Sequence, residues 1–128
     1  MKIYDTPDLR NVAILGHGDC GKTSLASAFL FVGGAVNRLG RVDDGTATTD
    51  FDEEEIERKI SLQTALAHVE WRGKKINLID TPGYAAFVAD AKAGLSVADA
   101  AFLLVEAVAG VQVITERVFK YCQEYQVP

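Results

Sequence analysis

Cysteine is scarce in this chain of 128 residues, which contains two, Cys20 and Cys122. They lie far apart in the sequence and form no CxxC pair. This pattern argues against a disulfide framework and against a thiolate metal site, and it is typical of a reducing compartment. We therefore expect a cytoplasmic protein.

Long apolar runs and an excess of positive charge are also missing. No apolar run reaches the length of a membrane span, and the opening MKIYDTPDLR has charges and a proline where a secretory signal would have an apolar core. Thirteen basic against eighteen acidic side chains give a net charge of −5. We expect no membrane partner and no generic binding of nucleic acid. The oligomeric state stays open.

Internal repeats, linkers and low-complexity segments are absent as well. The length and the 48% hydrophobic content suffice for the core of one small domain, or for one piece of a domain. Apolar and amphipathic segments follow one another in the order strand, helix, hairpin of two strands, helix, strand, helix. This alternation predicts an α/β protein with a mostly parallel sheet and helices on both faces.

The predicted elements follow from apolar periodicity. Short apolar runs predict the strands Asn11–Leu15, Ala65–Trp71, Lys75–Asp80 and Ala100–Val108, of which the last is typical of a central strand buried on both faces. Helical spacing predicts helices over Lys22–Val32, over a segment with Phe87, Val88, Ala91 and Leu95, and over Val111–Tyr125. The last helix would bury a stripe of Val111, Ile114, Val118, Phe119 and Cys122.

The segment Asn37–Ser61 is the most polar part of the chain and has no sustained apolar period. It predicts a long loop with one short charged helix around Asp52 to Arg58. Loops of this length are uncommon in compact domains and are usually functional or disordered. A solvated charged face is the alternative interpretation.

The stretch GHGDCGKT, Gly16 to Thr23, satisfies the pattern G-x-x-x-x-G-K-[ST] between a predicted strand and a predicted helix. Its glycines allow successive N–H groups to point inward as an anion nest at the positive end of the helix. Lys22 would add a charge for the β and γ phosphates, and the Thr23 hydroxyl would bind Mg²⁺. The stretch therefore predicts a nucleotide triphosphate site.

Two simpler interpretations of this stretch compete with that prediction. A glycine-rich turn could merely cap an ordinary helix. Cys20 within the loop could be a redox site, because loop amides lower a thiol pKa. However, no resolving cysteine is near it in the sequence, and a small loop residue is the simpler account.

Asp80 ends the predicted strand Lys75–Asp80 and begins the stretch DTPG. In phosphate-loop enzymes a carboxylate at such a strand end organises the magnesium shell. Gly83 would let the backbone approach a γ-phosphate, and Pro82 would stiffen that approach. The alternative is ordinary turn chemistry at a strand end.

Four stretches in this order resemble the G domain of translational GTPases, above all elongation factor G and its relatives: GHGDCGKT, DDGTATTDFDEEEIERKIS, DTPG and VEAVAGVQVITE. The resemblance covers nearly the whole chain, and four ordered matches are far more specific than one. It implies a Ras-like phosphate-loop fold that binds GTP or GDP with Mg²⁺. It also implies GTP hydrolysis on the ribosome, in translocation or recycling.

The resemblance assigns roles to individual residues. Ser61 stands where the family usually has threonine and would join Thr23 and Asp80 as a magnesium ligand, while Lys59 stands where the family usually has glycine. Asp19 would help to hold a monovalent cation. The residues implied in nucleotide binding are Gly16, His17, Gly18, Asp19, Cys20, Gly21, Lys22, Thr23, Ser24, Asp80, Thr81, Pro82 and Gly83.

Tyr84 is a departure from the family, which usually has histidine after DTPG to position the attacking water. Tyr84 and Lys22 are the candidate catalytic residues. A phenol has a pKa near ~10 and does not change charge near neutrality, but its hydroxyl can orient a water. Three interpretations of Tyr84 stay open. The protein is a weakened or specialised GTPase, or the tyrosine takes over the positioning role of the histidine, or Tyr84 has no catalytic role.

The guanine-reading NKxD sequence of the family would follow the next strand, just after Val127 and Pro128. We therefore expect the chain to be the N-terminal portion of a G domain, truncated before the last strands. The first functional hypothesis is a GTPase of the elongation factor G type. The alternatives are a nucleotide-binding switch module with little hydrolysis, and a phosphate-loop ATPase outside translation.

Overall fold

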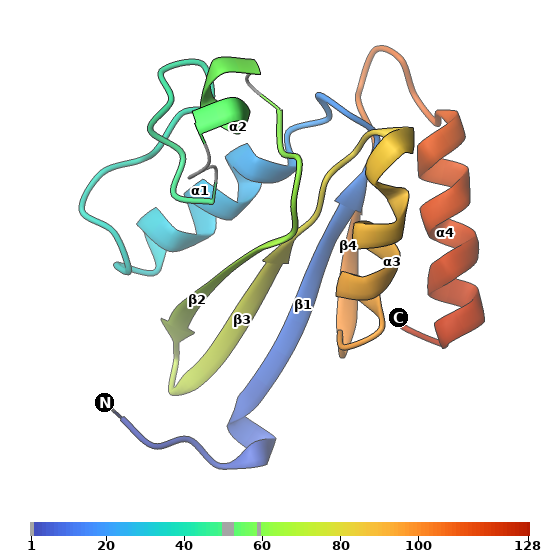
Figure 1. Cartoon of the computed structure of the whole chain (residues 1–128). Helices are drawn as coiled ribbons and strands as arrows, with labels where there is room; N and C mark the ends of the chain where they lie inside the picture. The colour runs from blue at the N-terminus through green and yellow to red at the C-terminus, as the bar shows by residue number, and fades with distance from the viewer. Residues whose placement is uncertain (1, 50–52, 59) are drawn as a thin grey trace.

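The computed structural model describes residues 2–49, 53–58 and 60–128 of the chain (Figure 1). Asp52 and Lys59, which the sequence analysis singled out, lie outside the described residues. The strands are β1 (Leu9–Gly16), β2 (Ala65–Trp71), β3 (Lys74–Asp80) and β4 (Ala100–Leu104). The helices are η1 (Thr6–Asp8), α1 (Lys22–Val32), α2 (Glu53–Arg58), η2 (Ala85–Phe87), α3 (Val88–Leu95) and α4 (Val113–Tyr125).

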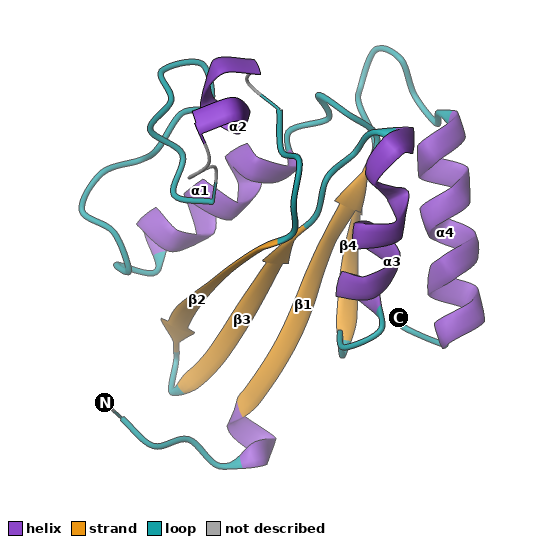
Figure 2. Ribbon diagram, in the orientation of Figure 1, coloured by secondary structure: helices purple, strands orange, loops and turns teal. Residues whose placement is uncertain are grey.

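The four strands form one sheet in the order β2-β3-β1-β4 (Figure 2). β1 pairs in parallel with β3 and with β4, whereas β2 pairs antiparallel with β3. The hairpin between β2 and β3 turns at Arg72 and Gly73, whose φ angles of 48° and 83° are the left-handed values that a tight hairpin turn needs. The predicted order of elements and the mostly parallel sheet are confirmed.

Helices cover both faces of the sheet, as predicted. On one face, α3 and α4 pack against Ala13, Leu15 and Ile79 of β1 and β3. On the other face, Leu30 of α1 packs against Leu78 of β3 and against β2. Neighbouring residues on a strand point to opposite faces, so Leu78 and Ile79 belong to different cores. The carboxyl ends of β1 and β3 therefore meet between the two helical layers.

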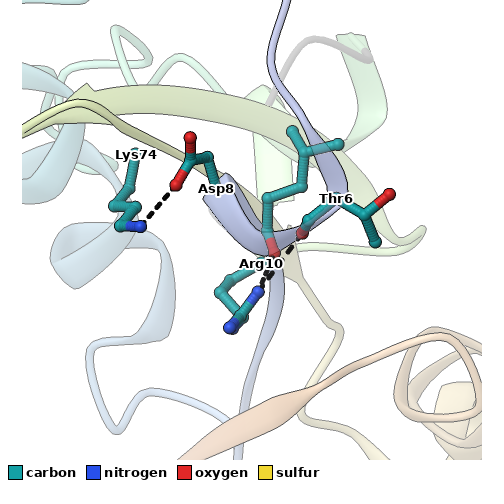
Figure 3. A network of polar contacts seen from close by, with 5 residues as sticks. Thr6, Asp8, Arg10 and Lys74 are labelled. Atoms are coloured by element: carbon teal, nitrogen blue, oxygen red, sulfur yellow. Dashed lines mark hydrogen bonds and ion pairs between the residues drawn. The ribbon is translucent and has the colours of Figure 1, made fainter.

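The N-terminal segment is attached to the hairpin by exposed polar contacts (Figure 3). Lys74 at the start of β3 forms an ion pair with Asp8 in η1. Arg10 in β1 donates to the carbonyl oxygen of Thr6 in η1 at 3.5 Å. Pairs of this kind are solvated and contribute little to stability, so the segment depends on β1 for its position.

Two predictions about the C-terminal elements are wrong. The strand over Ala100–Val108 ends at Leu104 and lies at the edge of the sheet among the described strands, so Phe102 and Val105 are each 47% exposed. Beyond Leu104 the chain makes a turn that an antiparallel bridge between Glu106 and Gly110 closes. The predicted helical stripe is only partly buried, since Val111 precedes α4 and Phe119 is 51% exposed.

The buried side chains of α4 should contribute more to the free energy of unfolding than its exposed ones. Val118 is 1% exposed in the core beneath α4, whereas Val113 on the same helix is 71% exposed. We expect Val118→Ala to lower the free energy of unfolding by about 2 kcal/mol, because it removes two buried methyl groups and leaves a cavity. Val113→Ala should change it by less than about 0.5 kcal/mol. Denaturant unfolding of both variants tests this, and equal losses would contradict the assignment of the core.

Candidate functional site

The predicted phosphate loop connects β1 to α1 at the carboxyl edge of the sheet. β1 ends at Gly16, with φ of 149°, and α1 begins at Lys22 directly after Gly21, with φ of 89°. L side chains rarely adopt such angles, which explains glycine at both ends of the loop. The strand, loop and helix that the motif requires are therefore present.

Lys22 lies in the first turn of α1 and is 6% exposed. Its Nζ donates a hydrogen bond to the carbonyl oxygen of His17 at 2.7 Å and contacts Cys20 Sγ at 3.9 Å. Burial lowers the pKa of Lys22, and the nearby Cys20, Asp80 and Asp19 oppose that shift. A buried ammonium is costly unless an anion faces it, so this site fits a phosphate.

Cys20 is half-buried, and burial raises the pKa of its thiol. A raised thiol pKa disfavours the thiolate, which is the reactive form. The redox interpretation of Cys20 therefore finds no support in its surroundings, and Cys20 is a small residue within the loop.

Thr23 and Ser61 come from segments far apart in the sequence, and the fold brings them together. Their hydroxyl oxygens lie 3.0 Å apart, close enough for a hydrogen bond. Thr23 is buried at the start of α1, and Ser61 follows α2 in the polar segment. Two hydroxyl oxygens at this place are hard oxygen donors, as Mg²⁺ prefers.

Asp80 ends β3 and is 1% exposed, and one of its oxygens accepts a hydrogen bond from the Thr49 hydroxyl at 2.8 Å. Thr49 is itself buried, and sequence reasoning missed it. The only signal was a group of threonines in the polar segment, which does not indicate which of them turns inward. Next to Asp80, Thr81 donates to the carbonyl oxygen of Ile14 at 2.7 Å and ties β3 to β1.

Gly83 packs directly against the phosphate loop. A Cβ atom at this position would lie 2.3 Å from Lys22 Nζ and 2.6 Å from the backbone nitrogen of Gly18. Only glycine fits without movement of these atoms. The DTPG stretch is thus packed against Lys22 and the backbone of the phosphate loop. The contact of Gly83 with a γ-phosphate stays a prediction.

Tyr84 reaches back over the phosphate loop. Its hydroxyl donates to the Asp19 carboxylate, at 3.1 Å from Oδ1 and 3.0 Å from Oδ2. Its ring lies on Gly18, where a Cβ atom would be 2.7 Å from Tyr84 Cζ. Burial and the neighbouring Asp19 raise the pKa of Tyr84. The phenol is therefore neutral near pH 7, with its proton directed to Asp19.

A cavity of about 650 Å³ opens between the phosphate loop and the polar segment. Among the predicted site residues, the following line it: Gly18, Asp19, Gly21, Lys22, Thr23, Ser24, Ser61, Gly83 and Tyr84. Residues 39–43 also line it; they belong to the polar segment Asn37–Ser61, and sequence reasoning singled out none of them individually. Of the remaining predicted residues in the described part of the chain, Gly16, His17, Cys20, Asp80, Thr81 and Pro82 lie behind this lining.

Metal binding at this cavity would depend on hydroxyls and phosphate oxygens more than on clustered acidic side chains. Within residues 2–49, 53–58 and 60–128, no three histidine, cysteine, aspartate or glutamate side chains converge on a possible metal position. The Thr23 and Ser61 hydroxyls are adjacent, and Asp80 is buried at the end of β3. Mg²⁺ often binds with few protein ligands, a substrate phosphate and water, so this donor set fits it.

Membrane crossing finds no support in the helices. Over the portion of the chain that the structure describes, no helix combines the length and the apolar character that a membrane span needs.

The chain is similar to known proteins over nearly its whole length. The family model described as the elongation factor Tu GTP binding domain matches residues 7–128. Elongation factor G of Thermotoga neapolitana is 40% identical over 99% of the chain, and the mitochondrial ribosome-releasing factor 2 of Debaryomyces hansenii is 41% identical over 93%. A crystal structure of a Thermus thermophilus protein is 42% identical, covers 93% of the chain and superposes with a TM-score of 0.90.

These relatives are much longer than the chain. It spans 18% of the Thermotoga protein, 14% of the Debaryomyces protein and 18% of the Thermus chain.

The contact between Tyr84 and Asp19 can be tested by titration. We expect Asp19→Asn to lower the pKa of Tyr84, because it removes the negative charge and one of the two carboxylate oxygens that favour the neutral phenol. The pKa should stay above the ordinary tyrosine value, because burial remains. Phenolate absorbance against pH measures this, and Tyr84→Phe identifies the signal among the four tyrosines of the chain. An unchanged Tyr84 titration would show that the contact is absent in solution.

Proposed function

This chain belongs to the elongation factor Tu GTP-binding domain family, and from that membership we propose that it binds GTP and GDP and that the full-length protein hydrolyses GTP on the ribosome. The relatives named as elongation factor G and as a ribosome-releasing factor support a role in translocation or recycling. They do not favour either alternative, a switch module without hydrolysis or an ATPase outside translation. We place the protein in the cytoplasm.

The buried ammonium of Lys22 is the observation that carries this proposal. It lies at the start of α1 beneath a cavity, where it donates to the backbone carbonyl of His17. A triphosphate would bring negative charge to it and to the N–H groups at the amino end of the helix. Gly18, Gly21 and Gly83 would let these groups approach the phosphates closely.

Mg²⁺ would be held by Thr23 and Ser61, with Asp80 behind them and Thr49 orienting one Asp80 oxygen. When bound, the ion would neutralise charge on the phosphates. Asp19 is our candidate for the monovalent cation, although its carboxylate accepts the Tyr84 hydroxyl here. A cation at Asp19 would therefore compete with Tyr84 for the same oxygens.

Tyr84 replaces the histidine that positions the attacking water in most of the family. In hydrolysis a water oxygen forms a bond to the γ-phosphorus while the bond to the bridging oxygen breaks, and the water must pass on a proton. The Tyr84 proton is directed to Asp19, which leaves a phenol lone pair to accept a hydrogen bond from that water. Because the raised pKa keeps the phenol neutral, we propose that Tyr84 orients water weakly and that hydrolysis is slow.

The lysine is tested through nucleotide binding. We expect Lys22→Met to weaken GTP binding by about a hundredfold or more, because a charged hydrogen bond to phosphate is lost. Lys120→Met, an exposed position on α4, should leave binding unchanged. Equilibrium titration of the full-length protein with a fluorescent GTP analogue measures both. Competition by ATP tests guanine selectivity there, because residues 1–128 hold no NKxD sequence. Equal competition by ATP and GTP would contradict a GTPase.

Tyr84 is tested by steady-state GTP hydrolysis of the full-length protein with ribosomes. We expect Tyr84→His to raise the rate at least about tenfold, since an imidazole near neutrality accepts a proton better than a phenol. Tyr84→Phe should change the rate less than about threefold if the hydroxyl contributes little. A large loss in Tyr84→Phe without a gain in Tyr84→His would mean that the tyrosine hydroxyl has taken over the positioning role.

A further inference from the structure

Glu55 carries a buried carboxylate on α2 that the proposed function does not use. Its side chain is 2% exposed, although its helix neighbours Glu53 and Glu57 are exposed. Its Oε1 accepts hydrogen bonds from the backbone N–H groups of Leu62 at 2.8 Å and Gln63 at 3.1 Å. The backbone carbonyl of Glu55 also accepts the N–H of Ile60 at 3.2 Å. Glu55 therefore accepts hydrogen bonds from the backbone both before Ser61, at Ile60, and after it, at Leu62 and Gln63.

These contacts join two pieces of chain that would otherwise be loosely held. A helix of six residues, the length of α2, is not stable by itself. A buried carboxylate is costly unless it is well hydrogen-bonded, and two backbone N–H groups give it charge-assisted partners. The carboxylate therefore makes α2 and residues 60–63 into one unit. That unit carries the Ser61 hydroxyl to a distance of 3.0 Å from the Thr23 hydroxyl.

Glu55 acts from behind the site. Ile60 and Ser61 line the cavity, whereas the lining that the described residues form does not include Glu55. The hydrogen bonds described above go to the backbone on either side of Ser61, so they provide a route by which Glu55 can affect a bound ligand through Ser61. This separates Glu55 from Asp80, whose carboxylate lies near the Lys22 ammonium.

We propose that Glu55 is a positioning residue that fixes the backbone around Ser61, so that the Ser61 hydroxyl stays beside Thr23 for recognition of the triphosphate. The inference rests on the proposed function, because it assigns Ser61 to the bound triphosphate and its magnesium. It makes α2 the element through which the polar segment is attached to the nucleotide site. Displacement of α2 would then weaken the triphosphate complex more than the diphosphate complex.

The test compares affinities for GDP and for a non-hydrolysable GTP analogue in the full-length protein with Mg²⁺. We expect Glu55→Ala to weaken binding of the GTP analogue about tenfold and binding of GDP less than about twofold. In a Ser61→Ala background, Glu55→Ala should cause no further loss, because both changes remove the same contribution. Glu55→Gln keeps an oxygen acceptor for the two N–H groups and should retain most of the affinity. Glu57→Ala, at an exposed position of α2, is the matched control.

Two results would overturn the inference. Equal weakening of both nucleotides by Glu55→Ala, additive with Ser61→Ala, would show a merely structural role. Unchanged amide hydrogen exchange at Leu62 and Gln63 in nucleotide-free Glu55→Ala would show that the carboxylate does not hold this segment. If Glu55→Ala does not fold, Glu55→Asp takes its place in the same cycle with Ser61→Ala, because the shorter side chain keeps the charge but draws the carboxylate away from the two N–H groups.

Failure of the proposed function has a different signature. If the unmodified protein bound neither guanine nucleotide, the proposed function would be wrong, and the role of Glu55 in triphosphate recognition with it. Faster exchange at Leu62 and Gln63 would still establish the contact itself. If the unmodified protein binds both nucleotides, any failure in the affinity cycle belongs to Glu55 alone.

Discussion

The burial of one positive charge sets the conditions for the whole site. Lys22 lines the cavity, and its ammonium donates a hydrogen bond to a backbone carbonyl oxygen. Burial of the ammonium lowers the pKa of Lys22. A charge in such a place becomes favourable when an anion replaces the lost water. The parallel pairing of β1 with β3 is what makes this possible, because it brings the loop after one strand against the DTPG stretch after the other.

The polar segment is attached to this centre at points that involve different groups. Thr49 reaches the Asp80 carboxylate, Ser61 reaches the Thr23 hydroxyl, and Glu55 holds the backbone beside Ser61. The first two contacts join the segment to the end of β3 and to the start of α1, and the third joins α2 to the residues that follow it. Such a segment has few apolar anchors, so a ligand that strengthens these contacts would stabilise its folded arrangement.

Tyr84 packs over the phosphate loop and hydrogen-bonds to Asp19. A tyrosine after DTPG offers a ring that fits over Gly18 and a hydroxyl that bonds to a carboxylate. The same carboxylate is our candidate for a monovalent cation. If a cation bound there, it would compete with the Tyr84 hydroxyl for these oxygens. A histidine in this position would respond to pH near neutrality, whereas the phenol does not.

The sequence by itself determined the order of the elements, the bounds of α1 and β2, and the place of the phosphate loop. These depend on local spacing, such as apolar periodicity and glycine at fixed positions, which a single segment contains. It also predicted that Thr23 and Ser61 serve one site, through resemblance. Only the tertiary structure decided that β4 lies beside β1 at the end of the order of described strands, that Thr49 turns toward Asp80, and that Glu55 is buried while Glu57 is exposed. These outcomes depend on which segments lie against each other, and no local pattern distinguishes Thr49 from Thr48 or Glu55 from its acidic neighbours.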